Sequence, residues 1–388
     1  MAVIIETNPS LYTPSDNPIV WTFSSNLTSL QNFSYIVEVY IDGVLDSNHQ
    51  VFPEVGAYAH FDASKKMTAK VEAPVVGQSN VVSDAFNNRE IYIKVFERYG
   101  TTPSNQSSAT SSPITAFKAS LSPVNMQNWD YSRYNISDVN KLFLTYLTDN
   151  ISIKTNSDYY LSIITNAESN LSVDINFKDI NGSVVATYSE PIDSSIKIVQ
   201  LMVNVDKLVS DGSITQGEAD LTNYVELLIR QGFNEASEYK VFNIDRECSN
   251  RGRHLIWLNH LGGFDQFNFS HNAMESGTTK RKKYSKQFGN WSGNDFVLDA
   301  NNAGDIEYTV TSDTSIQLVS DWLTQSVQNW LVQSVFEGVS VHLQPSLLTY
   351  SRVAVETNSY KLEQDFFEEL FNVIIKLKLS NSRNSPKI

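Results

Sequence analysis

The stretch from Arg246 to Phe269, RECSNRGRHLIWLNHLGGFDQFNF, constrains the fold more than any other part of this chain. It holds the only cysteine, Cys248, and the only Gly-Gly pair, Gly262-Gly263. Glycine tolerates the positive φ values that other residues avoid, so the pair suits a tight turn. Aromatic and β-branched residues flank the turn on both sides. We therefore expect a strand around Leu255 and Trp257, a turn at the two glycines, and a second, aromatic strand after it.

Length and charge exclude several classes of protein. A chain of 388 residues suggests two or three domains. Only 19% of the residues are charged, which is typical of β-rich extracellular or virion proteins whose surfaces are Ser, Thr and Asn. The net charge of −14 disfavours a general nucleic-acid binder. A single cysteine excludes an intrachain disulfide and a cysteine-based zinc site.

The start of the chain lacks the basic and apolar segments of a signal peptide. No window approaches the roughly 18 uninterrupted apolar residues of a membrane span. We therefore expect a protein that is made in a cytoplasm and has no membrane partner.

Residues 1–119 are expected to form an N-terminal β-sandwich of immunoglobulin or fibronectin type. The segment from Phe33 to Ile41 alternates strictly, and Asp42-Gly43 after it is a hairpin signal. One face of this predicted strand carries Tyr35, Val37 and Val39. The Ser- and Thr-rich stretch 101–113 is low in complexity and is predicted to be a loop or linker.

Residues 120–272 are expected to form a second β-sandwich, which the segment RGRHLIWLNHLGGFDQFNF closes. Asn181-Gly182 is the strongest short hairpin signal in the chain. The predicted strands of this domain are residues 158–165, 171–177, 183–188, 196–205, 224–230 and 239–244.

Residues 273–388 are expected to form a mixed α+β region with one prominent helix. Apolar residues recur at helical spacing from Ser315 to Phe336. Thr314 with Gln317 resembles a capping box, and Gly338 suits the end of the helix. The predicted strands here are residues 339–343, 352–356 and 373–379. The predicted fold class is therefore mainly β, with serial antiparallel β-sandwich domains followed by the α+β region.

The central stretch contains candidates for chemistry that we weigh against ordinary packing. His254, His260, Asp265 and His271 lie close in sequence, but their spacing matches no helical His pair, and strands splay such side chains apart. The residues around Cys248 match no signature of a cysteine protease, so we expect Cys248 to be a buried structural thiol. We therefore predict no catalytic, cofactor-binding or metal-binding residue.

The turn and its flanking strands are instead expected to build a rigid core around Gly262 and Gly263. Candidates for the core of the second domain are Trp257, Phe264, Asp265 and Phe267. Arg251 and Arg253 are predicted to fix the turn through hydrogen bonds to backbone or carboxylate groups. For these six side chains, ordinary packing and a direct role in an interface remain the two alternatives.

One concentrated positive patch stands out in the acidic chain. It consists of Lys280, Arg281, Lys282, Lys283 and Lys286. One interpretation is a contact with phosphate or with an acidic neighbouring subunit, and the alternative is a solvated loop. An oligomer of chains with this net charge needs complementary local patches, which favours the subunit contact.

Several segments resemble structural proteins of tailed bacteriophages that infect Bacteroidetes. The central stretch and the basic segment at residues 281–286 carry this resemblance. Three further segments share it: NPSLYTPSDNPIVWTFSSN with FSYIVEVYIDG, VFPEVGAYAHFDASK, and SYKLEQDFFEELFNVIIKLKLS. Within that group, the chain is most similar to the tail or neck ring proteins of crAss-like podoviruses. The similarity covers the start, the centre and the end of the sequence.

The resemblance implies a non-enzymatic virion protein, made in the host bacterial cytoplasm, that forms a homo-oligomeric ring below the portal. Its partners would be copies of itself and neighbouring tail or neck proteins. An acidic chain could surround the DNA exit channel without sticking to DNA, because like charges repel. The alternative is a glycan-binding tail adhesin or another hub or baseplate component, since β-sandwiches with exposed aromatics often stack sugars. An aromatic platform facing an open cleft would favour that alternative.

Overall fold

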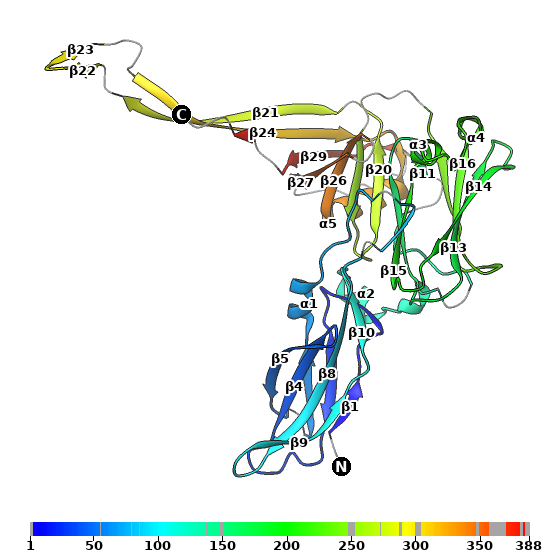
Figure 1. Cartoon of the computed structure of the whole chain (residues 1–388), viewed down its shortest axis with the longest axis vertical. Coiled ribbons are helices and arrows are strands. Elements are labelled where there is room, and N and C mark those ends of the chain that lie inside the picture. Colours follow the sequence, from blue (N-terminus) through cyan, green and yellow to red (C-terminus); the bar gives the residue numbers. More distant parts are fainter. Residues whose placement is uncertain are drawn as a thin grey trace.

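The chain folds into an N-terminal β-sandwich, a body that contains the remaining sheets, and a long hairpin that projects from the body (Figure 1). The structure is a computed structural model. It describes residues 3–54, 56–78, 80–84, 86–136, 139–147, 151–246, 253–271, 273–286, 289–298, 304–346, 349–356, 370–380 and 383–384. The predicted fold class, mainly β with serial antiparallel sandwich domains, is confirmed. No helix in these ranges is long and apolar enough to cross a bilayer.

The N-terminal sandwich packs two sheets around one core. Its first sheet has the order β1 (Ile4–Thr7), β3 (Val20–Ser24), β6 (Tyr58–Asp62). Its second has the order β2 (Tyr12–Pro14), β10 (Ile114–Phe117), β8 (Arg89–Tyr99), β4 (Ser34–Ile41), β5 (Val44–Val51). The predicted alternation in β4 is confirmed, because Tyr35, Val37 and Val39 are fully buried, and the Phe23 ring meets Tyr35 edge-on at 4.9 Å. A short helix, α1 (Ser64–Lys70), buries Met67 in the same core.

The Ser- and Thr-rich stretch is not the loop that its composition predicts. It contains β9 (Ser104–Thr110), an edge strand that pairs with β8. The Ser107 and Ser25 hydroxyls both donate hydrogen bonds to the buried Glu97 carboxylate. Backbone pairing with β8 and the Ser107 hydroxyl therefore hold a strand that has few apolar side chains.

The middle of the chain forms two further sheets. The larger has the order β11 (Ile151–Ile153), β18 (Lys240–Ile244), β16 (Tyr224–Gln231), β13 (Leu171–Lys178), β14 (Val184–Ile192), with β17 (Asn234–Glu235) beside β16. The smaller has the order β12 (Tyr159–Ile164), β15 (Ile198–Val203), β7 (Val82–Ser83). Three short α-helices lie here, α2 (Pro123–Gln127), α3 (Val205–Ser210) and α4 (Gln216–Leu221), together with a 3-10 helix, η1 (Tyr131–Arg133). The predicted hairpin at Asn181-Gly182 is confirmed, with a Gly182 φ of 79° between β13 and β14.

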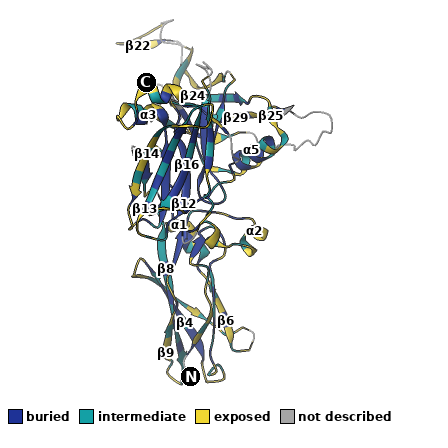
Figure 2. Ribbon diagram, turned by 90° about the vertical axis from the view of Figure 1, so that its right-hand side faces the viewer, coloured by how far each residue is buried: buried dark blue, intermediate teal, exposed yellow. Residues whose placement is uncertain are grey.

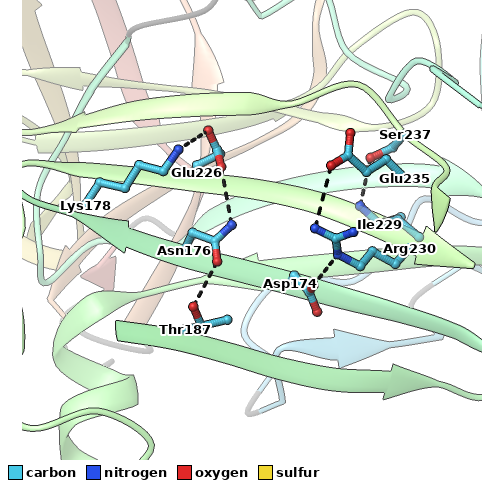
Figure 3. Close-up of polar contacts among 9 residues, drawn as sticks. All are labelled: Asp174, Asn176, Lys178, Thr187, Glu226, Ile229, Arg230, Glu235 and Ser237. Atoms are coloured by element: carbon cyan, nitrogen blue, oxygen red, sulfur yellow. Dashed lines mark hydrogen bonds and ion pairs between the residues drawn. The ribbon is translucent and has the colours of Figure 1, made fainter. Parts of the chain in front are cut away.

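The outer face of the larger sheet carries a ladder of paired charges (Figure 3). Asp174 pairs with the Arg230 Nε atom at 2.7 Å, and Arg230 also lies 3.7 Å from Glu235. Glu226 pairs with the Lys178 Nζ atom at 2.7 Å. Such cross-strand pairs stabilise the solvent face of a sheet modestly. The face drawn there therefore presents polar groups that are already satisfied by one another.

The central hairpin does not close this sheet, which corrects the sequence-based prediction. β19 (Arg253–Leu258) and β20 (Phe264–Phe269) pair with each other, and β19 then pairs with β26 (Val339–Ser346). The sheet continues through β27 (Thr349–Val355), β29 (Ile374–Leu379), β24 (Gly304–Val319) and β21 (Met274–Lys286). Alternation along a strand reports which face is buried but not which distant strand pairs with it. One continuous core joins this sheet to the middle sheets, because Trp257 and Leu377 belong to the same cluster as Val173 (Figure 2).

The prominent helix is shorter than predicted. It is α5 (Gln325–Glu337), and Gly338 follows it as expected. Residues 315–319 instead end β24, where Ile316 pairs with Leu377 and Leu318 with Ile375. Both Ile316 and Leu318 are buried, so strand alternation overrides the helical spacing there. The predicted capping box at Thr314 is therefore wrong, because Thr314 lies opposite Gly277 in the ladder.

Candidate functional site

The central hairpin is buried almost throughout. Trp257 and Phe264 are fully buried, and Phe267 is 8% exposed. The Trp257 ring lies 5.9 Å from the Trp330 ring on α5, and its indole Nε1 atom donates to the Ser334 hydroxyl at 2.7 Å. Trp257 and Phe267 belong to the large core that the middle and C-terminal sheets share, and Phe264 belongs to a smaller buried cluster with Tyr160 and Met202, so these side chains do not form a core of the second domain alone.

Asp265 is a fully buried carboxylate in this hairpin. It accepts hydrogen bonds from Thr145 at 2.5 Å, Asn259 at 2.9 Å, Ser334 at 3.0 Å and Trp330 at 3.3 Å. Burial raises the pKa of Asp265, and these four donors act in the opposite direction. The carboxylate thus joins β20 to α5 and to the segment at residue 145, which is a structural role.

The Gly262-Gly263 turn is pressed against two other backbone segments. Gly262 has a φ of +92°, and a Cβ atom there would lie 2.5 Å from the Lys118 carbonyl oxygen. A Cβ atom on Gly263 would lie 2.1 Å from the Leu144 carbonyl oxygen. Both positions therefore require glycine, as predicted. Gly262 has a positive φ, and at both positions a neighbouring backbone segment leaves no room for a Cβ atom.

Of the two arginines predicted to fix this turn, Arg253 does not. Arg251 lies outside the described residues. Arg253 lies opposite Phe269, at the far end of the hairpin from the glycines, and its Nη2 atom contacts Glu275 at 3.3 Å. The predicted carboxylate partner exists, but it anchors the start of β21.

The histidines of the central stretch do not converge. His260 contacts Glu337 at 2.9 Å and His271 contacts Asp321 at 3.4 Å, while His254 is buried elsewhere. In the described ranges, no three His, Cys, Asp or Glu side chains gather as metal ligands would. Cys248 lies outside the described residues.

His254 makes the stability of the fold decrease as the pH falls. Its Nε2 atom lies 2.8 Å from the Asp158 carbonyl oxygen and its Nδ1 atom 3.1 Å from the Asn268 amide oxygen. Burial lowers the pKa of His254 from 6.5 to about 4, and the two hydrogen bonds only partly oppose this. As the pH falls below 6.5, the unfolded chain takes up the proton first, so protonation favours unfolding.

We expect the His254 contribution to lower the free energy of unfolding by about 3 kcal/mol between pH 6.5 and pH 4. Urea unfolding of the native chain and of His254→Gln, across this range, measures it. The variant should be less stable at pH 7.5 but should lose less stability than the native chain as the pH falls. Equal losses in the two proteins would show that His254 does not cause the pH dependence.

The basic patch predicted from the sequence lies on β21, at the edge of the sheet that also contains the central hairpin. β21 is its last strand, and it pairs only with β24 among the described strands. β29 supports β24 at residues 315–319 and β30 (Arg383–Asn384) supports it at residues 311–312. We call residues 281–286 and 304–310, with the tip at residues 289–298, the arm. Figure 1 shows the arm extending sideways from the body, with β22 (Asn290–Ser292) and β23 (Asp295–Val297) at its end.

The basic side chains are exposed along β21 and partly paired with β24. The Arg281 Nη1 atom lies 2.5 Å from Glu307, and the Lys283 Nζ atom lies 3.6 Å from the same carboxylate. These two cations hold the pKa of Glu307 below its usual range. Lys280 lies 3.9 Å from Asp313, and Lys282 is exposed. The patch therefore lies on an exposed strand instead of a loop, and its contact with phosphate or an acidic subunit stays a prediction.

The arm also carries apolar groups that the sequence analysis did not single out. On the arm part of β24 these are Ile306, Tyr308 and Val310, none of which is fully buried. Tyr308 is 41% exposed, and its ring lies 6.1 Å from that of Tyr284 on β21. At the tip, Trp291 is 69% exposed and meets Phe296 edge-on at 5.5 Å. Gly293 between two short aromatic segments was the available sequence signal for this tip.

Comparison with known proteins does not place the chain in a family. No protein-family model and no curated protein matches the sequence. Among solved structures, the calcium-binding domain CBD12 of CALX1.1 is similar at 9% identity and a TM-score of 0.20, over 63% of this chain and 100% of that chain. Dpr2 Ig1-Ig2 in complex with DIP-Theta Ig1-Ig3 is similar at 8% identity and a TM-score of 0.17, over 98% and 90% of the two chains. TM-scores of this size carry no argument about fold or function.

Proposed function

We propose that this chain is a non-enzymatic structural subunit of a tailed bacteriophage that assembles with copies of itself into a ring. The ring would lie in the tail or neck, below the portal and around the DNA exit channel. The observation that carries self-assembly is the arm, a two-stranded ribbon with exposed aromatic residues at its end. The placement in a phage rests on the resemblance of the sequence to crAss-like ring proteins.

The physical argument for a partner is the instability of such a ribbon alone. A two-stranded hairpin is marginally stable in water unless another surface covers it. The free part of β24, residues 304–310, is about 20 Å long at the rise of a β-strand, and the tip adds to this reach. Exposed aromatic residues are enriched where proteins contact one another. An ordered arm of this kind is therefore expected to rest on a second molecule.

Charge favours another copy of this chain as that molecule. β21 carries five basic side chains and one acidic one. Residues 120–272, which supply every strand of the middle sheets except β7, carry 19 acidic and 11 basic side chains. An arm from one copy on the body of the next is a head-to-tail contact, and such contacts close into a ring when the rotation permits. The net charge of −14 would keep the assembly from sticking to DNA in the channel.

The position in the particle is tested by labelling. A short tag on the N-terminus of this chain, carried by the phage and decorated with gold-labelled antibody, should place gold at the neck or tail in negative-stain images. A tag on a capsid protein is the matched control, because its label should outline the head. Tagged particles that carry no label, while the capsid control labels normally, would contradict the proposal.

The second candidate function, binding of a glycan, is favoured by one observation. Two adjoining clefts of about 690 Å³ and 390 Å³ share Tyr146, which is 42% exposed. The smaller is also lined by Trp129 and Tyr134, whose rings stack at 5.4 Å. Aromatic side chains in an open cleft suit the face of a sugar, although Trp129 donates its indole N–H to the Tyr12 carbonyl oxygen and is half-buried. Burial also raises the pKa of Tyr146 to about 12.

A further inference from the structure

The larger cleft lies where three parts of the chain meet. Residues 120–125 form one wall, and α5 forms the opposite wall. His260, next to the Gly262-Gly263 turn, joins the two walls, because its Nδ1 atom lies 2.9 Å from the Ser120 carbonyl oxygen and its Nε2 atom lies 2.9 Å from Glu337. The fixed turn and α5 therefore give the cleft rigid sides.

The cleft combines an apolar base with a polar rim. Leu121 and Trp330 are 5% and 8% exposed and belong to two buried cores. Gln333 and Glu337 on α5 are exposed and offer oxygen acceptors at the rim. A ligand that fits this chemistry has a flat apolar body and a hydrogen-bond donor at its edge. An indole side chain has both features.

The arm tip presents such a group and cannot deliver it to its own cleft as the chain is folded. Trp291 is the most exposed tryptophan among the described residues, at 69%. Figure 1 shows β22 and β23 at the far end of the arm, away from α5. A contact between the tip and this cleft must therefore join two copies of the chain.

We infer that Trp291 at the arm tip of one copy inserts into the cleft beside α5 of a neighbouring copy. This inference rests on the proposed function, because it names the surface through which the copies assemble. Large aromatic side chains that fill a pocket on the partner dominate the energy of many interfaces. Phe296, which packs on Trp291 at the tip, would hold the indole in place. The basic strand behind the tip would then approach the acidic body of that neighbour.

Cross-linking between two differently substituted chains tests the contact. In a Cys248→Ser background, one chain carries Ser292→Cys, beside the intact Trp291 at the arm tip, and the other carries Gln333→Cys, and the two are mixed and mildly oxidised. In the matched control, the second chain carries Ser189→Cys instead of Gln333→Cys. Ser189 is exposed on β14, on the outer face of the larger middle sheet. We expect a disulfide-linked pair of one chain of each kind when the second chain carries Gln333→Cys, and little linkage when it carries the control substitution. As a second measurement, Trp291→Ala should weaken association by roughly 30-fold or more, as loss of a central aromatic anchor does.

The outcomes separate this inference from the proposed function. An oligomer that forms by light scattering but gives no more linkage at position 333 than at 189 overturns the inference and leaves self-assembly intact. A chain that stays monomeric and unlinked overturns both. Binding of an oligosaccharide in the cleft, blocked by Tyr146→Ala and unaffected by Trp291→Ala, would also overturn the inference and favour the glycan-binding function.

Discussion

Excision of the arm is expected to leave a folded chain that no longer assembles. Residues 281–310 can be removed without changing the pairing of the remaining strands, because Lys280 lies directly opposite Thr311. Replacing residues 281–310 with Asn-Gly would join these two positions through a two-residue hairpin turn. The pairing of β24 with β29 and β30 would remain. None of the removed residues belongs to the described cores, so the melting temperature should change little while the oligomer is lost.

Light scattering and thermal melting of the excised chain check this prediction. A single charge reversal gives a milder version of the test, since Lys282→Glu should weaken assembly by roughly fivefold and reduce its dependence on salt. Lys65→Glu on α1 is the matched control, because it changes the net charge equally at another exposed lysine. Unchanged assembly after excision would show that the copies associate through some other surface.

Gly263→Ala is expected to destabilise the chain more than alanine at any other described glycine. The new Cβ atom would lie 2.1 Å from the Leu144 carbonyl oxygen, which is backbone and cannot rotate away. That oxygen also accepts a hydrogen bond from the Asn259 amide at 3.1 Å, and Leu144 itself is fully buried. Relief of the clash must move this segment, at a cost of about 3–5 kcal/mol.

Thermal unfolding measures this cost, with a fall in melting temperature of about 10 °C expected for a domain of ordinary size. Gly277→Ala is the control, because Gly277 lies on exposed β21 with no atom within 4 Å of its added Cβ. If the two variants melted at the same temperature, the turn would not be clamped as described.

Local sequence patterns predicted most strands because one face of each strand is buried. Phe33 to Ile41 is the clearest case, with Tyr35, Val37 and Val39 on the core side of β4. The same reasoning failed at residues 315–319, where Ile316 and Leu318 fit a strand and the wider spacing fits a helix. It also failed for β9, whose Ser and Thr side chains give no apolar alternation.

The candidate site was predictable only in part. The basic residues at 280–286 were visible as a charge cluster, but β21 is exposed along nearly its whole length and therefore shows no burial pattern. The cleft beside α5 depends on contacts between residues far apart in the sequence, such as Ser120 with His260. No local pattern reports such a contact, so the pairing of arm tip and cleft required the structure.

The molar mass of the purified, unmodified chain tests self-assembly most directly. Light scattering over a range of concentrations, with negative-stain images of the same sample, should give a whole-number multiple of 43.7 kDa and closed ring outlines. A mass of 43.7 kDa at every concentration, from a chain that is also missing from phage particles, would contradict the account.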